Sequence, residues 1–363
     1  MRITAPVLIE AGRPMEMLEL DVDDPGQGEV RVRMVASGVC HSCLHAADGS
    51  HPKVPKPIVL GDEGSGVVEK AGKGCLSLVP GDHVIISWAP VCSSCTLCHL
   101  GLPALCTNPQ PFGYLFDGTT RFHHRGEDVH HYGPSTFSPY IVVPEEGAVK
   151  IRSDFPLDQA ALIGCSVTTG YGAVVNTARV KAGQSVAVLG CGGIGLNAIQ
   201  GAYLAGAHPI IGIDVLESKL AWAREFGATH TINSTASDVV ERVREVTGPG
   251  VDVSVVAVGH PHPMEQGLHM LGPQGIEVVI GLPVPGSTFP VDPHLLIQGE
   301  RRITGSRYGS GNPHVEFPKM IDLARSGHLR IGDLVTERFR PDQANQAFRS
   351  LAAGEQARGL IVF

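Results

Sequence analysis

Four cysteines in one short segment have the spacing of a metal site. They are Cys92, Cys95, Cys98 and Cys106, in the pattern C-x2-C-x2-C-x7-C. Four thiolates on a single loop are what a closed, tetrahedral zinc site requires. A ferredoxin-type cluster would place the fourth cysteine after only three residues and a proline behind it, whereas here Thr107 follows. Because four free thiols would be a redox liability, the pattern predicts a structural zinc without a catalytic role.

A glycine-rich turn in the middle of the chain has the form of a dinucleotide-binding site. An apolar strand runs into a G-x-G-x-x-G motif, whose members are Gly190, Gly192, Gly193, Ile194 and Gly195. Its glycines allow a tight turn, close approach of a pyrophosphate and close packing of the following helix. Asp214 ends the next strand, where a carboxylate can accept both ribose hydroxyls and repel a 2′-phosphate. The motif predicts NAD in preference to NADP, although an aspartate here is also a common helix N-cap.

The composition is that of a globular protein with about two domains. The chain has 363 residues, of which 43% are hydrophobic and 18% charged. Acidic residues outnumber basic ones by 36 to 28, which gives a net charge of -8 and argues against a nucleic-acid surface. No leader-like segment or run of ~20 apolar residues is apparent, and nine cysteines fit metal chemistry better than disulfides. We therefore expect a cytoplasmic protein with a small-molecule substrate and no nucleic-acid or membrane partner.

The elements that must position these sites change character along the chain. Over the first 150 residues, short strands such as 30–35 alternate with Gly/Pro turns, which predicts an antiparallel β-rich module. From about Gln184, strands at 185–189, 209–213, 253–258 and 277–280 alternate with helices at 217–226 and 238–246. This alternation predicts a doubly wound parallel sheet. Helices at 314–326 and 343–353 and a strand at 360–363 follow, and we expect this tail to return to the first domain.

Three further segments carry a family resemblance. They are Gly38-Val39-Cys40-His41-Ser42, Gly61-Asp62-Glu63-Gly64 and Gly164-Cys165. With the two sites above, they make nearly the whole chain resemble the zinc-dependent alcohol dehydrogenases of the medium-chain dehydrogenase/reductase family. The resemblance implies an α/β protein with a GroES-like β-rich catalytic domain (1–166 and 308–363) and a Rossmann NAD-binding domain (167–307). It also implies an oxidoreductase with two zinc ions per subunit and NAD, which interconverts alcohols, mainly primary, and aldehydes by hydride transfer.

The same resemblance makes Cys40 and Cys165 ligands of a catalytic zinc. The third ligand departs from the family pattern, which has Gly-His-Glu where this chain has Gly61-Asp62-Glu63. Aspartate can bind zinc through oxygen, but two thiolates and a carboxylate leave the metal formally at -1, so we expect a weaker Lewis acid.

A second departure concerns the residue that follows Ser42. Cys43 stands where the family has an aspartate that supports the ligating histidine, and its loss fits Asp62 as ligand because two carboxylates would repel. Three alternatives stay open: Cys43 binds the metal in place of Asp62, Glu63 is a further ligand, or the site holds no metal.

The resemblance assigns further roles around these sites. Ser42 and His45 match a proton relay from the substrate oxygen to solvent, with a solvated loop histidine as the alternative for His45. His41 and Arg358 match positions that contact the cofactor phosphates, and both could equally be surface charges. Lys219 matches a residue that contacts the ribose, and Thr169 lies where the nicotinamide would pack.

The substrate pocket and the assembly are predicted less directly. Trp88 and Tyr132 match the pocket wall, although each is as often a core residue. The roughly thirty residues between Cys106 and Tyr140 resemble the longer loop of dimeric members, so we expect a homodimer. The arginine that selects glutathione adducts in some relatives has no evident counterpart after Cys106.

Two other classes of function remain open at this point. One is a medium-chain reductase of activated alkenes or quinones without catalytic zinc. The other is a non-enzymatic, NAD-binding redox sensor that uses its cysteines.

Overall fold

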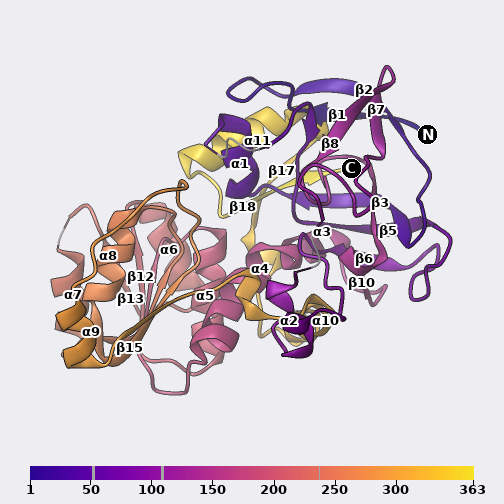
Figure 1. Cartoon of the computed structure of the whole chain (residues 1–363). Helices are drawn as coiled ribbons and strands as arrows, with labels where there is room; N and C mark the ends of the chain where they lie inside the picture. Colours follow the sequence, from indigo (N-terminus) through magenta and orange to yellow (C-terminus); the bar gives the residue numbers. More distant parts are fainter. Residues whose placement is uncertain (51–53, 108–109, 237) are drawn as a thin grey trace. The chain divides into compact units, whose positions relative to one another are not determined.

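The computed structural model describes residues 1–50, 54–107, 110–236 and 238–363, and its chain divides into two compact units (Figure 1). Unit 1 comprises Met1–Cys165 and Asn312–Phe363, and unit 2 comprises Ser166–Gly311. These borders lie close to those that the resemblance implies. Among the described residues, none of the helices combines the length and the apolar character that a bilayer crossing would need.

Unit 1 is built on two sheets in which most neighbouring strands are antiparallel. One has the order β1-β2-β7-β8-β4; the other has the order β10-β6-β5-β3-β18-β17, with β9 also paired to β3. The strands are β1 (Arg2–Val7), β2 (Glu16–Val22), β3 (Glu29–Gly38), β4 (Ile58–Val59), β5 (Gly64–Ala71), β6 (His83–Ile86), β7 (Phe122–His124), β8 (Glu127–His131), β9 (Tyr140–Pro144), β10 (Ala148–Ile151), β17 (Val335–Phe339) and β18 (Arg358–Val362). The C-terminal strand β18 pairs antiparallel with β3, so the tail completes the sheet of this unit.

Short helices connect these strands. They are α1 (His41–Asp48), α2 (Thr96–His99), α3 (Leu157–Ala160), α10 (Pro313–Arg325) and α11 (Ala344–Ala353), with the 3-10 turns η1 (Pro103–Leu105), η2 (Glu145–Gly147), η3 (Ala161–Gly164), η6 (Gly332–Leu334) and η7 (Pro341–Gln343). Helices α1 and α11 contribute to one apolar cluster, in which the rings of Phe137 and Phe348 lie 5.8 Å apart. Burial of this cluster fixes the start of α1 beside the end of β3.

Unit 2 has the doubly wound parallel sheet that the alternating pattern predicts. Its order is β13-β12-β11-β14-β15-β16, so the strand order reverses between β11 and β14. The strands are β11 (Val186–Leu189), β12 (Ile210–Asp214), β13 (His230–Asn233), β14 (Val251–Val256), β15 (Leu271–Val279) and β16 (Arg302–Gly305). The helices are α4 (Ser166–Gly172), η4 (Ala173–Ala178), α5 (Gly193–Leu204), α6 (Glu217–Glu225), α7 (Val239–Thr247), α8 (Pro261–His269) and α9 (Pro293–Gly299), with the 3-10 turn η5 (Tyr308–Ser310).

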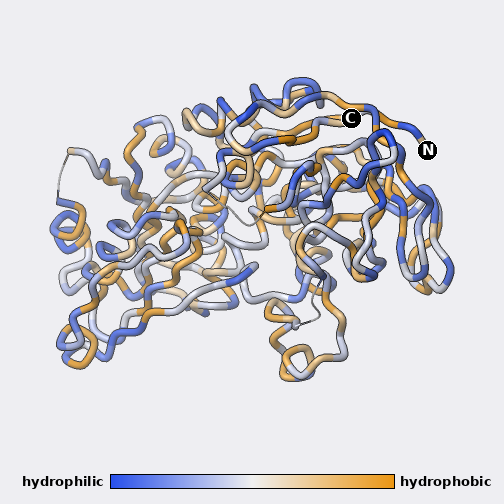
Figure 2. Tube along the Cα trace, turned by 45° about the horizontal axis from the view of Figure 1, so that its top comes forward, coloured by the Kyte–Doolittle hydropathy of each residue, from blue (hydrophilic) through white to orange (hydrophobic). Residues whose placement is uncertain are grey.

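The core of unit 2 follows from this layering. Strand β11 is buried along its whole length because helices cover both faces of a parallel sheet. Figure 2 shows hydrophilic and hydrophobic residues close together along the helical turns of this unit, as expected for helices that bury one face. In α7, for example, Val239 and Val243 are the buried residues.

One acidic residue lies inside this core. Glu277 of β15 is fully buried next to Ser254 of β14, its partner in the sheet register. Within the described chain, neither carboxyl oxygen of Glu277 nor the hydroxyl of Ser254 has a hydrogen-bond partner. Gly267 of α8 packs so closely that a Cβ there would lie 2.6 Å from Glu277 Oε1. Burial raises the pKa of Glu277 from 4.5 to about 8, because the charged form loses its hydration.

This buried acid predicts that stability falls as the pH rises. Between about pH 5 and 8, folded Glu277 holds a proton that the unfolded chain releases, so the free energy of unfolding decreases across this window. Glu277→Gln should remove that slope and raise the free energy of unfolding by about 2–4 kcal/mol at pH 8. Urea unfolding at several pH values measures it, with the exposed Glu300→Gln as control. An unchanged slope in Glu277→Gln would contradict the prediction.

Candidate functional site

Three predicted ligands converge in unit 1. The ligand atoms of Cys40, Asp62 and Cys165 all lie within 4.8 Å of one another, and the residues are 5%, 7% and 8% exposed. Each stands at the end of an element: Cys40 caps α1 after β3, Asp62 precedes β5, and Cys165 follows η3. Gly61 has a φ of +107°, a conformation that favours glycine and turns the chain so that Asp62 enters the site.

The three groups suit a cation. The Cys165 thiol hydrogen-bonds to Cys40, which holds the pKa of Cys40 well below its usual range and raises that of Cys165. Burial, together with the nearby charge of Cys40, raises the pKa of Asp62 to about 7. Buried acidic groups that compete for protons in this way gain most from a divalent ion that replaces those protons. Two thiolates and one carboxylate are also an ordinary partial ligand set for zinc, so the residues present fit the metal.

The two alternative ligands have other partners. The Cys43 thiol donates to Asp62 Oδ1 over 3.6 Å and is not part of the three-residue group. Glu63 is fully buried and forms an ion pair with Arg358, which is 3% exposed. The structure therefore does not support Cys43 or Glu63 as ligand. It also corrects the picture of Arg358 as a surface charge, because its guanidinium balances the buried Glu63 carboxylate.

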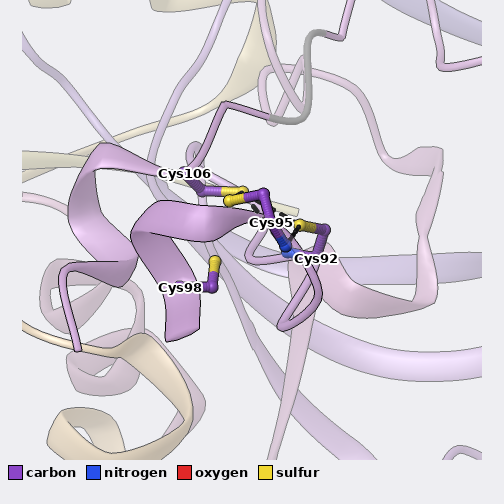
Figure 3. Close-up of side chains that lie close together, drawn as sticks. All are labelled: Cys92, Cys95, Cys98 and Cys106. Atoms are coloured by element: carbon purple, nitrogen blue, oxygen red, sulfur yellow. Dashed lines mark hydrogen bonds between the residues drawn. The ribbon is translucent and has the colours of Figure 1, made fainter. Parts of the chain in front are cut away.

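The four-cysteine loop forms a second cluster (Figure 3). Cys98 belongs to α2, Cys95 is its N-cap, and Cys106 directly follows η1. The sulfur atoms of Cys92 and Cys106 are 3.5 Å apart, and those of Cys95 and Cys106 are 4.0 Å apart. A tetrahedral site with zinc–sulfur bonds of about 2.3 Å places sulfurs about 3.8 Å apart, so the loop has the size that zinc needs.

Backbone groups stabilise negative charge in this loop. The Thr107 and Cys98 amides are the largest causes that lower the pKa of Cys95, to about 5. The Cys95 amide also donates to Cys92 Sγ over 3.3 Å, and the Cys92 amide to Cys106 Sγ over 3.4 Å. Amides that point at thiolates are a recurrent feature of sites that hold a metal through sulfur.

The glycine turn of unit 2 joins β11 to α5. A Cβ at Gly195 would lie 1.7 Å from the Gly190 carbonyl oxygen, so only glycine lets the helix pack this closely on the turn. At Gly192 nothing lies within 4 Å of the corresponding point, which leaves that side of the turn open. Helix α5 begins at Gly193 with its N-terminal amides at this turn, the usual setting for a bound phosphate. The described residues thus fit a dinucleotide.

Asp214 ties this turn to the end of β12. Its Oδ2 accepts the Cys191 amide at 2.8 Å and its Oδ1 accepts the Leu216 amide at 3.1 Å. The N-cap of α6 is Leu216, so Asp214 is not the helix N-cap that its residue type also allowed. Each carboxylate oxygen keeps a lone pair with which a ribose hydroxyl could interact.

The remaining predicted residues fall in both units. In unit 2, Thr169 precedes Gly170, where an added Cβ would lie 2.1 Å from the Ile194 carbonyl oxygen, so α4 and α5 pack closely here. Lys219 is half-buried in the first turn of α6. In unit 1, His41 is exposed and His45 half-buried on α1, with ring centroids 6.4 Å apart.

The two predicted aromatic residues are half-buried in unit 1. The Tyr132 hydroxyl donates to the Ser42 carbonyl oxygen over 2.9 Å, which ties this ring to the metal-binding segment. Trp88 lies between β6 and the four-cysteine loop, and its place in the pocket wall stays a prediction.

Two features of the site were not predicted from the sequence. Phe112 is 51% exposed, and its ring meets Tyr132 edge to face at 6.0 Å, so the aromatic wall beside Ser42 has a second member. The Glu63–Arg358 ion pair joins residues from the two chain segments that form unit 1. Neither pair has a spacing signal, because both arise from contacts between distant segments.

Comparisons with known proteins cover most of the chain. Residues 26–153 match the family model "Alcohol dehydrogenase GroES-like domain", and residues 193–326 match "Zinc-binding dehydrogenase". The chain is 39% identical over 377 residues to an alcohol dehydrogenase class-3 of Cereibacter sphaeroides, and 38% identical over 376 residues to an S-(hydroxymethyl)glutathione dehydrogenase of Paracoccus denitrificans, with 100% of both chains covered in each case. The crystal structure of benzyl alcohol dehydrogenase from Acinetobacter calcoaceticus is similar with a TM-score of 0.95 and 34% identity, covering 100% of this chain and 99% of the other.

The two clusters predict about two zinc ions per subunit. Cys95→Ser should lose the zinc ion of the four-cysteine loop, and Asp62→Ala should lose the zinc ion of the three-residue group. Each variant should therefore retain about one zinc ion per subunit. Elemental analysis of purified protein measures this. Cys75→Ser, which changes a cysteine outside both groups, is the control and should keep both ions. A wild-type content of one ion, unaffected by Asp62→Ala, would contradict the second site.

Proposed function

This chain belongs to the zinc-dependent alcohol dehydrogenases of the medium-chain dehydrogenase/reductase family, and we propose that it interconverts primary alcohols and aldehydes at the Cys40–Asp62–Cys165 site. The predicted α/β fold class, family and enzyme class are confirmed by the comparisons. The family uses zinc and a nicotinamide dinucleotide, and its substrates are small molecules. The roles proposed for individual side chains rest on contacts within this chain.

The observation that carries the proposal is a buried metal-binding group with a hydroxyl beside it. Zinc in such a site polarises an alcohol oxygen and makes its proton easier to remove. Ser42 donates to Asp62 Oδ2, which leaves the lone pairs of its oxygen free to accept a hydrogen bond from a substrate hydroxyl. His45 follows Ser42 by three residues on α1 and so shares its face of the helix. We assign the pair to orienting the alcohol and passing its proton towards solvent.

The side chains near Ser42 favour an apolar, ring-bearing substrate. Tyr132, whose hydroxyl contacts the Ser42 carbonyl oxygen, and the half-exposed Phe112, whose ring contacts Tyr132, form an aromatic wall near Ser42. A glutathione adduct, the substrate in the names of several relatives, would need cationic groups for its carboxylates. The first arginine after Cys106 is Arg121, which is already paired with Glu29 and Asp117. A benzyl-type primary alcohol is therefore the substrate class that we favour.

The second substrate is NAD in this proposal. The Gly190–Gly195 turn receives the pyrophosphate at the N-terminus of α5, with Ile194 and Gly193 supplying backbone amides. Asp214 faces the turn with a carboxylate that would repel the 2′-phosphate of NADP. Lys219, Thr169, His41 and Arg358 remain predicted cofactor contacts.

We further propose a cytoplasmic homodimer. Strand β16 ends the sheet of unit 2, where one of its sides has no neighbour among the described strands. Exposed apolar side chains occur in the connection between β15 and β16, with Ile297 at 73%, Leu282 at 58% and Val284 at 55%. An open sheet edge near apolar groups is a common subunit contact. Light scattering with size-exclusion chromatography tests the dimer. The cytoplasmic location is supported by the nine cysteines, all free of disulfides, which suit a reducing compartment.

Steady-state kinetics of the zinc-loaded protein test the function. We expect turnover of benzyl alcohol and of aliphatic primary alcohols with NAD, and weak turnover of S-(hydroxymethyl)glutathione. The kcat/KM with NADP should be lower than that with NAD. Asp214→Asn should reduce the ratio of the two values by about tenfold, or ~1.4 kcal/mol, and its amide oxygen can still accept the Cys191 amide. Turnover of quinones by metal-free protein would favour a reductase instead, and NAD binding without turnover of any alcohol or aldehyde would favour a redox sensor.

The proton path predicts a pH-dependent defect in His45→Gln. Alcohol oxidation should slow by about 10- to 100-fold near neutral pH, because the imidazole that carries the alcohol's proton on to solvent is missing. A small added base such as imidazole should restore part of the rate. His314→Gln, an exposed histidine on α10, is the matched control. A pH profile of His45→Gln that superimposes on the wild type would remove His45 from the path.

A further inference from the structure

The first turn of α1 holds both oxygens of the Asp62 carboxylate. Ser42 donates to Oδ2, and its neighbour Cys43 donates through sulfur to Oδ1 over 3.6 Å. We propose that Cys43 is a positioning residue for Asp62 at the catalytic metal, acting as a neutral thiol donor and not as a metal ligand. This inference rests on the proposed function, because it takes the Cys40–Asp62–Cys165 group to be the metal site.

The position of Cys43 supports a donor role. Its side chain is fully buried in the apolar cluster that includes Val39, Ala46 and Leu60, so packing limits where the sulfur can point. Asp62 Oδ1 accepts the proton of this thiol, and the Gly61 backbone also hydrogen-bonds to the sulfur. The sulfur is also absent from the group of atoms that lie within 4.8 Å of one another. Cys43 therefore reaches the metal site through Asp62.

A thiol at this place meets two requirements at once. A carboxylate oxygen has two lone-pair positions, so each oxygen of Asp62 can accept one donor and still face an ion. A donor on each side limits rotation of the carboxylate and replaces part of the hydration that Asp62 loses on burial. A carboxylate in place of the thiol would put a second negative charge beside Asp62 and oppose its ionised form. The thiol thus supplies a hydrogen bond without adding charge.

Cys43→Ser and Cys43→Ala separate this role from simple packing. Both variants remove the bulk of the sulfur, but only serine keeps a donor. The measurement is cadmium-113 NMR of the protein loaded with two cadmium ions, combined with chelator competition for each ion. The number of sulfur ligands determines the chemical shift, so the four-cysteine loop gives a separate resonance that serves as an internal reference.

We expect the second resonance to keep its two-sulfur position in both variants. Cys43→Ala should bind that ion about 10- to 100-fold more weakly than the wild type, and Cys43→Ser should recover most of the loss. Affinity at the four-cysteine loop should be unchanged throughout. Cys43→Val, which fills the cavity without a donor, should behave like Cys43→Ala and takes its place if that variant does not fold.

Three results would overturn the inference. Equal affinities of Cys43→Ser and Cys43→Ala would show that the hydrogen bond has no effect. A shift of the second resonance to that of a site with one sulfur fewer, in both variants, would make Cys43 a ligand. A wild-type protein with only the four-sulfur resonance would remove the metal site itself, and with it the proposed function, whereas the first two results leave that function intact.

Discussion

The arrangement of unit 1 depends on three acidic side chains that are buried together. Cys40, Asp62 and Cys165 lie within 4.8 Å of one another and are almost without solvent. Three negative charges in such a place are unstable, so without a cation the pKa values of the three groups move apart: that of Cys40 falls, whereas those of Asp62 and Cys165 rise. The fold holds the groups together nonetheless, because the elements that carry them are fixed by contacts elsewhere. The rest of the fold thus holds these acidic groups together, and a bound cation would remove the repulsion between them.

Those supporting contacts surround the segment 61–64. The Ser37 and Thr136 hydroxyls both donate to the Glu63 carbonyl oxygen, at 2.9 Å and 3.0 Å, and so fix the backbone next to Asp62. The Glu63 carboxylate is in turn balanced by Arg358 at the start of β18. Since β18 pairs with β3, the C-terminal tail connects this balance to the strand that leads to Cys40. A long-range strand pairing therefore supports both sides of the metal site.

In unit 2 the structural requirement is different: the backbone amides at the start of α5 must be accessible to an anion. The close contact of Gly195 with Gly190 brings the start of α5 against the turn, and Asp214 holds the turn through the Cys191 amide. The same carboxylate can therefore keep the turn in shape and discriminate between cofactors. By contrast, the buried carboxyl group of Glu277 on β15 forms no hydrogen bond within the described residues. Its cost in stability is a property of the core and is separate from the binding turn.

The sequence by itself determined what depends on residues close together in the chain. The cysteine spacing from 92 to 106 is local, because one loop supplies all four sulfurs. The glycine motif with the strand before it and the helix after it is likewise local, and alternating periodicity determined the doubly wound sheet. The segments around Cys40, Asp62 and Cys165 carried the family resemblance, which predicted that these three side chains meet but left the roles of Cys43 and Glu63 open.

Only the tertiary structure decided that Cys43 contacts Asp62 and that Glu63 contacts Arg358. It also decided that the rings of Phe112 and Tyr132 meet and that, among the described residues, the Glu277 carboxyl oxygens have no hydrogen-bond partner. The reason is physical: a motif fixes backbone shape through neighbouring residues, whereas the partner of a buried charge is chosen by the packing of segments that are distant in sequence.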